Sequence, residues 1–494
     1  MKFKIHLFLL FAACLAIGCE DLEDTYKDYA GDGAIRYLGK ATGVSVHPGW
    51  KRLLVKWTNS VDPAIVNVKV QWNLNGVRKD TLLAKDVSEC NIKNLEDGNY
   101  EISVFGVDKN GNTSLSLPSY ARPYTEEHEV IRSFTRVVSK HAYIKDRLIL
   151  FFSDWQNNVD SASLNYYTPE GELEHIELTA DFVKNNKYYL LPNAIDPTKE
   201  ISVYRRGRVE GCEDLITFDP YILLHEKFYT SDFKQWAKEK YGQSEITDEW
   251  INSLDEFEFD YNLNSFEDLL NMPQLKTLIL GKGRYMNVVQ QDTAYSKLLD
   301  MERSLFTLDV LHELNQLTVH RYSKHYFPKE VPAYLQEEGN KNTPPTVEFM
   351  DEKDWTYRCL EDEDSSLGDL FDGDAETFWY PGMKSTAPGT YTIEVDMQEV
   401  KRISGVRVLQ NLFTPRDQLS RSFMPDVIKI EYSLDKLQWR SATHVETNTI
   451  GVSNGEATYL DFKEVTEAQY LRFTLYDQTY RTFFGIKLAG LDAY

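Results

Sequence analysis

Cysteine is scarce in this chain and is never found at the close spacing that metal sites use. Five cysteines occur in 494 residues, and none belongs to a CxxC or a combined Cys/His pattern. Cys90, Cys212 and Cys359 stand far apart, as is typical of single buried apolar side chains. We therefore expect neither a zinc site nor a disulfide framework.

Positive charge is also in short supply. The 54 Lys and Arg residues face 77 Asp and Glu residues, which gives a formal net charge of −23. Proteins that bind phosphate backbones need clustered Lys and Arg, because counterion release supplies most of the affinity. The composition therefore argues against nucleic acid as a partner.

Catalytic motifs are missing as well. The segment from His312 to Gln316 has the first half of a zinc-protease motif, but Gln316 stands where the second histidine ligand is required. No nucleophile elbow occurs, and the domain organisation leaves no block for the paired carboxylates of a glycosidase. We expect a protein that is not an enzyme.

Aromatic residues, by contrast, are plentiful. The chain has 30 Tyr, 25 Phe and nine Trp, and such residues pack well on pleated sheets. The length suggests several domains. The fold class we predict is a mainly β, multidomain protein.

The amino terminus carries a secretion signal. Lys2 and Lys4 precede an apolar run from Ile5 to Ile17, and Gly18-Cys19 follows. A charged start, a short apolar run and a small residue at the break are typical of a signal peptide, here residues 1–18. The run is too short to serve as a membrane span.

The segment from Leu15 to Cys19 resembles a bacterial lipobox, although Ala16 stands where Leu is commonest. The acidic run from Glu20 to Asp24 resembles the surface-export signal of Bacteroidota lipoproteins. The resemblance implies lipidation of Cys19, contact with the membrane through that lipid anchor only, and a place on the outer face of the outer membrane. Residues 19–34 would then form an acidic tether. The alternative is an ordinary signal peptide cleaved nearby.

Residues 35–125 alternate in the manner of β-strands. The clearest strands are 53–57 and 66–72, and Asn75-Gly76 is a hairpin signal. Tyr100 opens a later strand directly after a turn, which resembles the tyrosine corner of immunoglobulin-like sandwiches. The unit resembles a fibronectin type III domain, in which Trp57 and Tyr100 would be core residues.

Residues 127–225 contain a second set of strands, at 148–152, 163–167, 188–191 and 201–204, which predicts another β-sandwich. Two sandwiches in tandem resemble surface lipoproteins of gut Bacteroidota, where such pairs precede a sugar-binding module. The basic cluster from Arg205 to Arg208 is more consistent with a solvated hairpin than with a binding patch.

Residues 226–345 change in character. Helices are predicted near 233–241 and 245–254. Two later stretches, at 275–280 and 314–319, share an L-x-x-L-x-L spacing that resembles leucine-rich repeats, although a stable solenoid needs three or more. We expect a small α/β insert. It could contact another protein, but a packing wedge between domains is the favoured interpretation.

The stretch from Leu370 to Tyr380 combines an Asp-Gly-Asp turn with a hydroxyl and an aromatic run. Asp372, Asp374 and Thr377 would offer a hard cation such as Ca²⁺ the oxygen ligands it prefers. The alternative is an acidic surface turn that its own side-chain hydrogen bonds close.

Further motifs follow in a fixed order around this turn. They are Trp355, the strands at 391–396, 406–410 and 424–433, Trp439, and the strands at 469–473 and 488–492. This series resembles the discoidin (coagulation factor type C) fold, which includes many carbohydrate-binding modules. It covers residues 348–494 and implies a β-sandwich of the jelly-roll type.

The resemblance implies a structural Ca²⁺ on Asp372, Asp374 and Thr377 together with a late acidic residue. This chain has Gly490 at the expected acidic position, with Asp492 two residues further on. Because the loss of one carboxylate weakens a hard-cation site, calcium binding is left open.

In such modules a ligand binds to loops at one end of the sandwich, where aromatic rings stack on sugars and polar groups bond their hydroxyls. The candidates for sugar binding are Tyr380, Asn411, Phe413, Arg416, Arg421, Tyr480, Arg481 and Phe483. Trp379 is expected in the core at the base of the loop.

Together these features predict a non-catalytic, cell-surface glycan-binding lipoprotein. From the resemblance we expect it to serve a polysaccharide-uptake system, with a glycan as ligand and an outer-membrane transporter complex as a partner. The alternative is a surface adhesion or scaffold protein whose discoidin-like module binds another protein.

Overall fold

The computed structural model describes residues 37–494, except for the segments 287–295, 328–330, 339–346, 364–365, 384–386, 415–419 and 479–483. The predicted signal peptide, the tether and the lipidation residue Cys19 lie outside the described residues.

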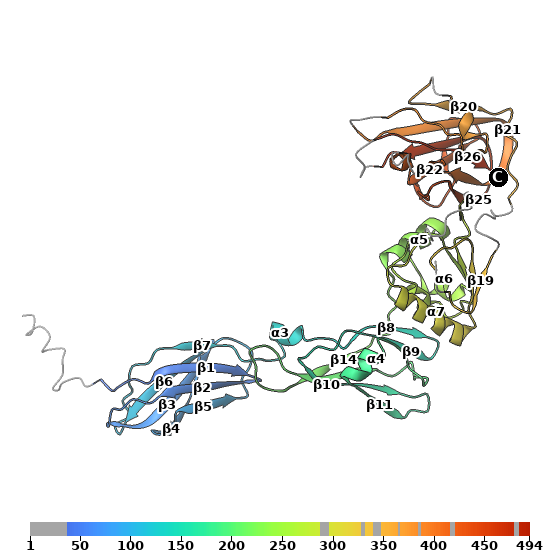
Figure 1. The fold of residues 1–494 in the computed structure, drawn as a ribbon. Helices are drawn as coiled ribbons and strands as arrows, with labels where there is room; N and C mark the ends of the chain where they lie inside the picture. The colour runs from blue at the N-terminus through green and yellow to red at the C-terminus, as the bar shows by residue number, and fades with distance from the viewer. Residues whose placement is uncertain are drawn as a thin grey trace, which may run out of the picture.

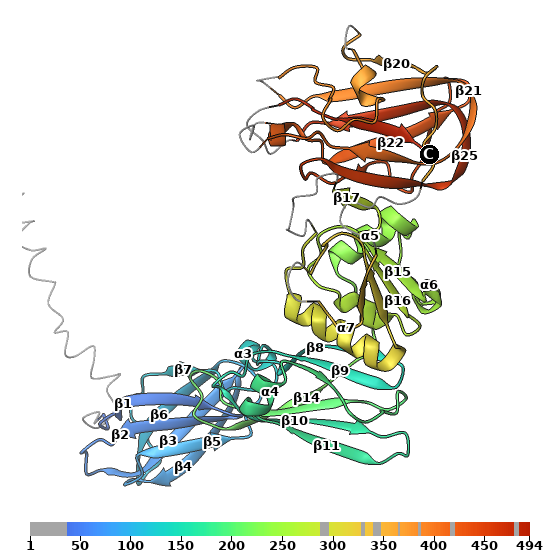
Figure 2. The same ribbon diagram turned by 45° about the vertical axis from the view of Figure 1, so that its right-hand side comes forward.

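The chain is mainly β and forms several domains, as predicted (Figure 1). Two sandwiches lie end to end, and an α/β unit and a large β-module are stacked on the far end of the second sandwich. The views in Figures 1 and 2 agree on this L-shaped outline. Among the described residues, no helix combines the length and the apolar character that crossing a bilayer requires.

The N-terminal sandwich packs a three-stranded sheet, β1-β2-β5, against a four-stranded sheet, β4-β3-β6-β7. Trp57 and Tyr100 are both buried in its core, and the Glu96 amide donates to the Tyr100 hydroxyl at 3.2 Å. Its strands are β1 (Thr42–Gly49), β2 (Arg52–Thr58), β3 (Ile65–Leu74), β4 (Val77–Ala84), β5 (Glu89–Lys93), β6 (Tyr100–Asp108) and β7 (Ser119–Ala121).

The second sandwich has a three-stranded sheet, β12-β9-β8, and a four-stranded sheet, β11-β10-β13-β14. The short helices α3 (Glu129–Arg132) and α4 (Ala180–Asn185) accompany it. Its strands are β8 (Val138–Ile144), β9 (Arg147–Phe152), β10 (Val159–Tyr167), β11 (Leu173–Leu178), β12 (Tyr188–Leu190), β13 (Ser202–Gly207) and β14 (Ile216–Ile222).

The basic cluster at 205–208 is divided: Arg206 and Arg208 are exposed, as expected of a solvated hairpin, whereas Arg205 is not. Arg205 turns inward, where its guanidinium lies 4.7 Å from the centre of the Tyr221 ring and donates to the Phe134 and Thr135 carbonyls. Arg206 points outward. The alternation of a strand separates neighbouring side chains in this way.

A bidentate ion pair joins the two sandwiches. Arg52 donates to both carboxylate oxygens of Asp214, at 2.9 and 2.7 Å, and the Trp50 amide donates to the same carboxylate at 2.7 Å. Bidentate geometry fixes orientation as well as distance, so this contact restricts bending between the sandwiches.

The α/β unit contains four parallel strands in chain order, β15-β16-β18-β19. The two L-x-x-L-x-L stretches lie side by side within it, with Leu278 paired to Val319. The bounds are α5 (Ser231–Tyr241), α6 (Asp248–Ser253), β15 (Glu256–Phe259), η1 (Glu267–Asn271), β16 (Thr277–Leu280), β17 (Arg284–Met286), α7 (Met301–Asn315), β18 (Thr318–Arg321) and β19 (Leu335–Glu337).

The end of α7 explains why the segment from His312 to Gln316 cannot hold zinc in the manner of a protease. Gln316 has a left-handed backbone, with φ of 59°, and caps the helix. The helix ends where the second ligand would stand. His312 Nδ1 lies 2.8 Å from the Leu317 carbonyl oxygen.

The hydrophobic core of the α/β unit extends onto strands β8 and β9 of the second sandwich, whose own core is a separate cluster. Ile144, Ile149 and Phe151, from β8 and β9, belong to the same buried cluster as Leu308 and Leu311 of α7. Removing such an area from water stabilises the joint, because each fully buried side chain contributes about 1.5–3 kcal/mol.

The C-terminal module is a two-layer β-sandwich built around two long strands, β21 (Thr390–Leu409) and β25 (Glu456–Tyr476). Each long strand bends where its register shifts and so contributes to both layers. One layer has the order β20-β21-β25-β22-β23, and β26 extends the other from β21. The remaining bounds are β20 (Thr356–Cys359), η2 (Gly368–Leu370), η3 (Ser420–Phe423), β22 (Val427–Ser433), β23 (Arg440–Ser441), β24 (Asn448–Thr449) and β26 (Gly490–Ala493).

The α/β unit contributes a strand to the sheet of this module. Its β17 pairs antiparallel with the start of β25 (Figure 2), where Arg284 lies opposite Thr458. The Arg284 guanidinium forms an ion pair at 2.5 Å with Glu456, whose side chain is fully buried. The Tyr261 hydroxyl donates to the Thr449 carbonyl across the same junction. The two units therefore share both backbone pairing and a buried charge pair.

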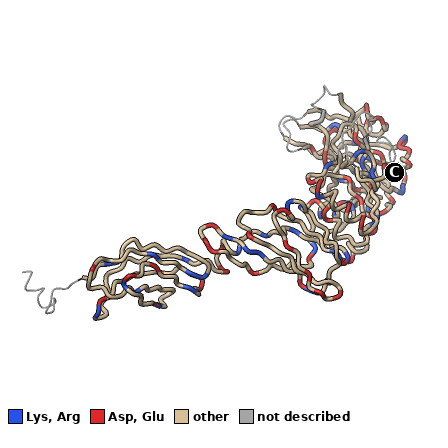
Figure 3. The backbone as a smooth tube through the Cα atoms, turned by 60° about the horizontal axis from the view of Figure 1, so that its bottom comes forward, with Lys and Arg blue, Asp and Glu red and all other residues tan. Residues whose placement is uncertain are grey.

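Charged residues of both signs are mixed along every domain (Figure 3). No domain of the described chain has a tract in which blue segments alone gather.

Candidate functional site

The Asp-Gly-Asp turn forms as predicted and brings its three oxygen-bearing side chains together. Asp372 accepts from the Asp374 amide at 2.9 Å and from the Thr377 hydroxyl at 2.7 Å. Asp374 in turn accepts from the Glu376 amide at 2.9 Å. Gly373 has φ of 71°, the left-handed conformation that favours glycine. The carboxylates thus close the turn by bonding its own backbone and hydroxyl.

An arginine lies beside this turn. Arg407 donates through Nε to Asp492 at 2.8 Å, and its Nη2 lies 3.9 Å from the place where a Cβ on Gly373 would stand. Asp492 Oδ1 lies 4.0 Å from the same point, so this late carboxylate does approach the turn. Its charge is already paired with the guanidinium.

Two of the side chains predicted to hold Ca²⁺, Asp372 and Asp374, already accept hydrogen bonds within the turn, and calcium binding stays a prediction. A hard cation needs several uncommitted oxygens, whereas a guanidinium supplies the positive charge beside this turn. Among the residues that the structure describes, no group of three or more His, Cys, Asp or Glu side chains could hold a metal ion. The turn is closed by its own hydrogen bonds, and the neighbouring Arg407 is paired with Asp492.

Trp379 and Tyr380, which follow the turn, lie in different environments. Trp379 is 2% exposed and pairs through its backbone with Leu488, so its predicted place in the core agrees with the structure. Tyr380 is half-buried, with its ring centre 5.4 Å from that of Phe423. Lys487 Nζ lies 5.1 Å from the centre of the Tyr380 ring.

These contacts bring three loops together at one end of the module. We call this region the loop end and define it as these three loops, residues 378–383, 422–426 and 484–489, together with the adjoining segments 410–414 and 451–456, to which Gln410 connects them. The Lys487 amide donates to the Phe423 carbonyl at 2.8 Å, and the position of a Cβ on Gly485 lies 3.4 Å from the Tyr380 ring. Loops far apart in sequence thus share one surface.

Buried amides hold the loop end in place. Gln410 Nε2 donates to the carbonyls of Pro425 and Gly451, at 2.8 and 2.7 Å. Gln478 Nε2 donates to the Met424 carbonyl at 2.5 Å. Because these bonds tie backbone to side chains inside the domain, the surface is organised before any ligand arrives.

Asn411 is fully buried at the loop end, yet its side-chain amide has no hydrogen-bond partner among the described residues. Phe413, two residues on, is half-buried, and Asn454 holds its backbone through bonds of 2.7 and 2.9 Å. A buried polar group without a partner costs about 1–3 kcal/mol. Such a group is typical of a position that a ligand or water completes.

The structure places Tyr380, Asn411 and Phe413 at the loop end, three of the eight predicted sugar contacts. Arg421 lies in η3, but its side chain is outside the described residues. Also outside the described residues are Arg416, Tyr480, Arg481 and Phe483.

Sequence reasoning missed Phe423 and Lys487. Lys487 Nζ lies 4.9–5.7 Å from the ring centres of Phe378, Tyr380 and Phe423. A signal was available, because Lys487 stands between the fully buried Ile486 and Leu488. In an extended segment that alternation turns the lysine outward.

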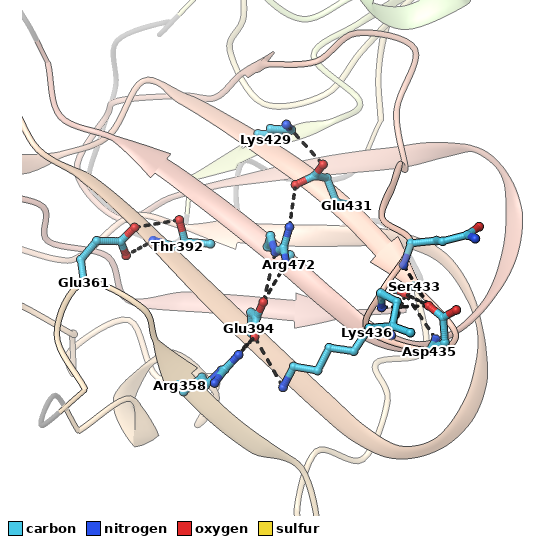
Figure 4. A network of polar contacts seen from close by, with 12 residues as sticks. Arg358, Glu361, Thr392, Glu394, Lys429, Glu431, Ser433, Asp435, Lys436 and Arg472 are labelled. Carbon is cyan, nitrogen blue, oxygen red and sulfur yellow. Dashed lines mark hydrogen bonds and ion pairs between the residues drawn. The ribbon is translucent and has the colours of Figure 1, made fainter.

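The sheet face of the module carries a different polar network, shown in Figure 4. Arg358, Glu394, Arg472 and Glu431 lie directly opposite one another on four adjacent strands. Glu394 accepts from both arginines at 2.8 Å, and the Trp439 ring covers the Arg472 guanidinium at 3.7 Å. We call this row the charge ladder. Since each charge has a partner, it stabilises the sheet.

A family model described as the F5/8 type C domain matches residues 360–486. The C-terminal module is therefore an F5/8 type C, or discoidin-like, domain. A second family model, described as a domain of unknown function, matches residues 19–203. None of the curated proteins matches the chain.

Solved structures of single modules are similar to part of the chain. One is a family 32 carbohydrate-binding module from Clostridium perfringens in complex with galactose, with 14% identity, 28% of this chain and 92% of that chain covered, and a TM-score of 0.22. An F5/8 type C domain from Bacteroides fragilis gives 15% identity, 31% and 97% coverage, and a TM-score of 0.24. A fragment of a putative chitobiase from Bacteroides thetaiotaomicron gives 16% identity, 30% and 92% coverage, and a TM-score of 0.25.

Proposed function

We propose that the protein is a non-catalytic glycan-binding lipoprotein whose loop end contacts the sugar. Lipid on Cys19 would anchor it to the outer face of the outer membrane, where it would serve a polysaccharide-uptake system beside a transporter. The N-terminal part of the chain would hold the discoidin-like module away from the anchor.

The observation that carries the proposal is the convergence of three loops around Tyr380, Phe423 and Lys487 in an F5/8 type C domain. A half-buried aromatic ring offers a face on which a sugar ring can stack. Lys487 adds donors for hydroxyl oxygens. The Asn411 amide lies in the same loop system and provides one donor group and one acceptor.

Isothermal titration of residues 20–494 against a panel of soluble polysaccharides and oligosaccharides tests this assignment. We expect the combined change Tyr380→Ala and Phe413→Ala to lower affinity by about five- to 140-fold. The loss of two stacking partners costs about 1–3 kcal/mol, and each 1.4 kcal/mol is a factor of ten.

The matched control is Tyr470→Ala, which removes a half-buried tyrosine from the face of the charge ladder. Its affinity should equal that of the wild type. Unchanged binding by the Tyr380/Phe413 variant would refute the site. Release of dye from chromogenic glycosides by the purified protein would refute the non-catalytic part.

Radiolabelled palmitate tests the anchor. The wild-type precursor should incorporate the label, and Cys19→Ala should not. Protease treatment of intact cells should then degrade the wild type if it lies on the outer face. Protection of the wild type from protease would place it elsewhere.

A further inference from the structure

A groove crosses the outer face of the second sandwich, far from the loop end. Its volume is about 590 Å³, and it lies on the sheet β11-β10-β13-β14. This volume is within the range of about 300–1,000 Å³ typical of ligand sites.

The strand register explains the groove. Ser163 of β10 lies opposite Tyr204 of β13 on one side and opposite Glu177 of β11 on the other. Ser161 lies opposite Arg206 in the same way. Short side chains on the central strand form the floor, and longer side chains on both neighbours form the walls. We call this site the β10 groove.

Neither neighbouring domain covers this face. The α/β unit packs against β8 and β9, which belong to the other sheet, whereas β10 and β11 lie on the side away from it (Figures 1 and 2). The contact with the N-terminal sandwich is made at Asp214. Tyr204 is 42% exposed.

The groove combines aromatic rings with groups that both donate and accept hydrogen bonds. Trp155 and Tyr204 both line it. Among the described residues, neither Arg206 nor Glu177 is committed to a side-chain hydrogen bond or ion pair. Uncommitted donors and acceptors beside aromatic faces match a polyol, whose hydroxyls do both, better than a purely apolar or purely charged ligand.

A peptide strand is a poorer fit. Peptides that extend a sheet need a free strand edge, but β10 is paired on both sides, with β11 and β13. The ligand must therefore be recognised through side chains along the sheet face. A sugar chain lying along the Ser161–Ser163 floor meets that requirement.

We propose that the β10 groove is a second glycan-binding site, which holds a neutral segment of the polysaccharide whose other part contacts the loop end. The ligand class rests on the proposed function, whereas the position and shape of the groove do not. Two linked sites raise overall avidity by about 10²–10⁴ over one.

Four full-length proteins lacking the signal peptide test the inference by affinity electrophoresis in gels containing galactomannan, xyloglucan or arabinogalactan. They are the wild type, the loop-end variant Tyr380→Ala/Phe413→Ala, the groove variant Tyr204→Ala/Arg206→Ala, and the combination of all four changes. We expect each double variant to lose at least about fivefold in affinity and the combination to show no retardation.

A further variant, Ser163→Tyr, fills the floor without removing a wall, and should weaken binding as the groove variant does. Tyr120→Ala, which removes an exposed tyrosine from the N-terminal sandwich, is the control and should bind as the wild type. Binding that survives both groove changes but is lost in the loop-end variant would overturn the second site and leave the proposed function intact. Binding lost only through the groove would overturn the loop end instead. If the wild type bound none of the three polysaccharides, both the loop-end site and the β10 groove would be refuted as glycan-binding sites.

Discussion

Arg407 changes the interpretation of the Asp-Gly-Asp turn at residues 372–374. Beside the turn that the sequence predicts to be a metal site, the structure places a guanidinium paired with Asp492, because Arg407 and Asp492 come together across strands β21 and β26. Burial raises the pKa of Asp492, and the hydrogen bond and charge of Arg407 oppose that rise. The arginine therefore offsets part of the cost of burying this carboxylate, although the pKa of Asp492 stays above its ordinary value.

Chelation should leave the wild type unaffected if the arginine supplies the positive charge. We expect excess EDTA to change Tm by less than about 3 °C, which corresponds to roughly 1 kcal/mol for a domain of this size. Differential scanning calorimetry with and without Ca²⁺ checks this. A larger calcium-dependent rise in Tm would restore the metal site at Asp372, Asp374 and Thr377.

Two substitutions separate the roles of the turn and the arginine. Arg407→Gln leaves Asp492 buried without its partner and should lower the free energy of unfolding by about 3–5 kcal/mol. Asp374→Asn keeps the acceptor for the Glu376 amide and should cost less than about 1 kcal/mol. Equal losses in urea unfolding would contradict this division.

At the scale of elements, the charge ladder predicts a dependence of stability on pH. Burial raises the pKa of Glu394, but hydrogen bonds from Arg472 and Arg358 outweigh burial and bring the pKa below its ordinary value. A carboxylate with a lowered pKa stabilises the fold above its unfolded pKa, and this contribution is lost as the pH falls through the folded pKa.

Glu394→Gln should accordingly destabilise the module at pH 7 by about 2–4 kcal/mol, because two arginines lose their partner. The difference from the wild type should shrink as the pH falls below the ordinary glutamate pKa of about 4.5. Urea unfolding at pH 7, 5 and 3.5 measures it. The exposed Glu464→Gln serves as the control, and a difference that stayed constant down to pH 3.5 would show that Glu394 does not act through its charge.

The junction strand β17 makes a prediction of its own. Arg284→Met leaves the carboxylate of Glu456 fully buried without a cation, at a cost of about 3–5 kcal/mol. The double variant Arg284→Met/Glu456→Leu should recover much of this loss, since both buried charges are then removed. Two-state fits of thermal unfolding would show it. A double variant no more stable than the single one would argue against a direct pair.

The strands of the module could be predicted because alternation and turn residues are local signals. The stretch at 391–396 lies in β21 and that at 469–473 in β25. The β10 groove could not be predicted, because its floor and walls depend on the register between strands. Nothing in the sequence around Ser161 and Ser163 indicates a binding site. The groove results from the register that places Arg206 and Tyr204 opposite them. The three residues of β17 carry no pattern at all.

The candidate site was accessible to sequence reasoning only in part. Tyr380 could be found because it follows a recognisable turn, and Asn411 and Phe413 because they follow a strand. What brings them together is Gln410, which reaches carbonyls 15 and 41 residues away in the sequence. Contacts of such sequence separation leave no local signature.

For the whole molecule, the three joints predict a stiff, extended particle. A compact chain of this size would have a radius of gyration of about 23 Å. The L-shaped arrangement in Figure 1 should give a clearly larger value in small-angle X-ray scattering of residues 37–494. Arg52→Ala, which breaks the bidentate contact with Asp214, should broaden the distribution of distances. A wild-type value near 23 Å would mean that the domains fold back on one another.

Strand β17, which the α/β unit contributes to the sheet of the module, also limits where the chain can be divided into fragments. A fragment beginning at residue 348 would retain all the motifs that identify the discoidin-like domain, yet it would lack one edge strand and the cation that Glu456 requires. A fragment that includes Arg284 also needs the α/β unit that holds β17 in place, and therefore its parallel sheet. The discoidin-like domain is therefore not structurally independent. Recombination or engineering that transfers it intact has to transfer the α/β unit as well.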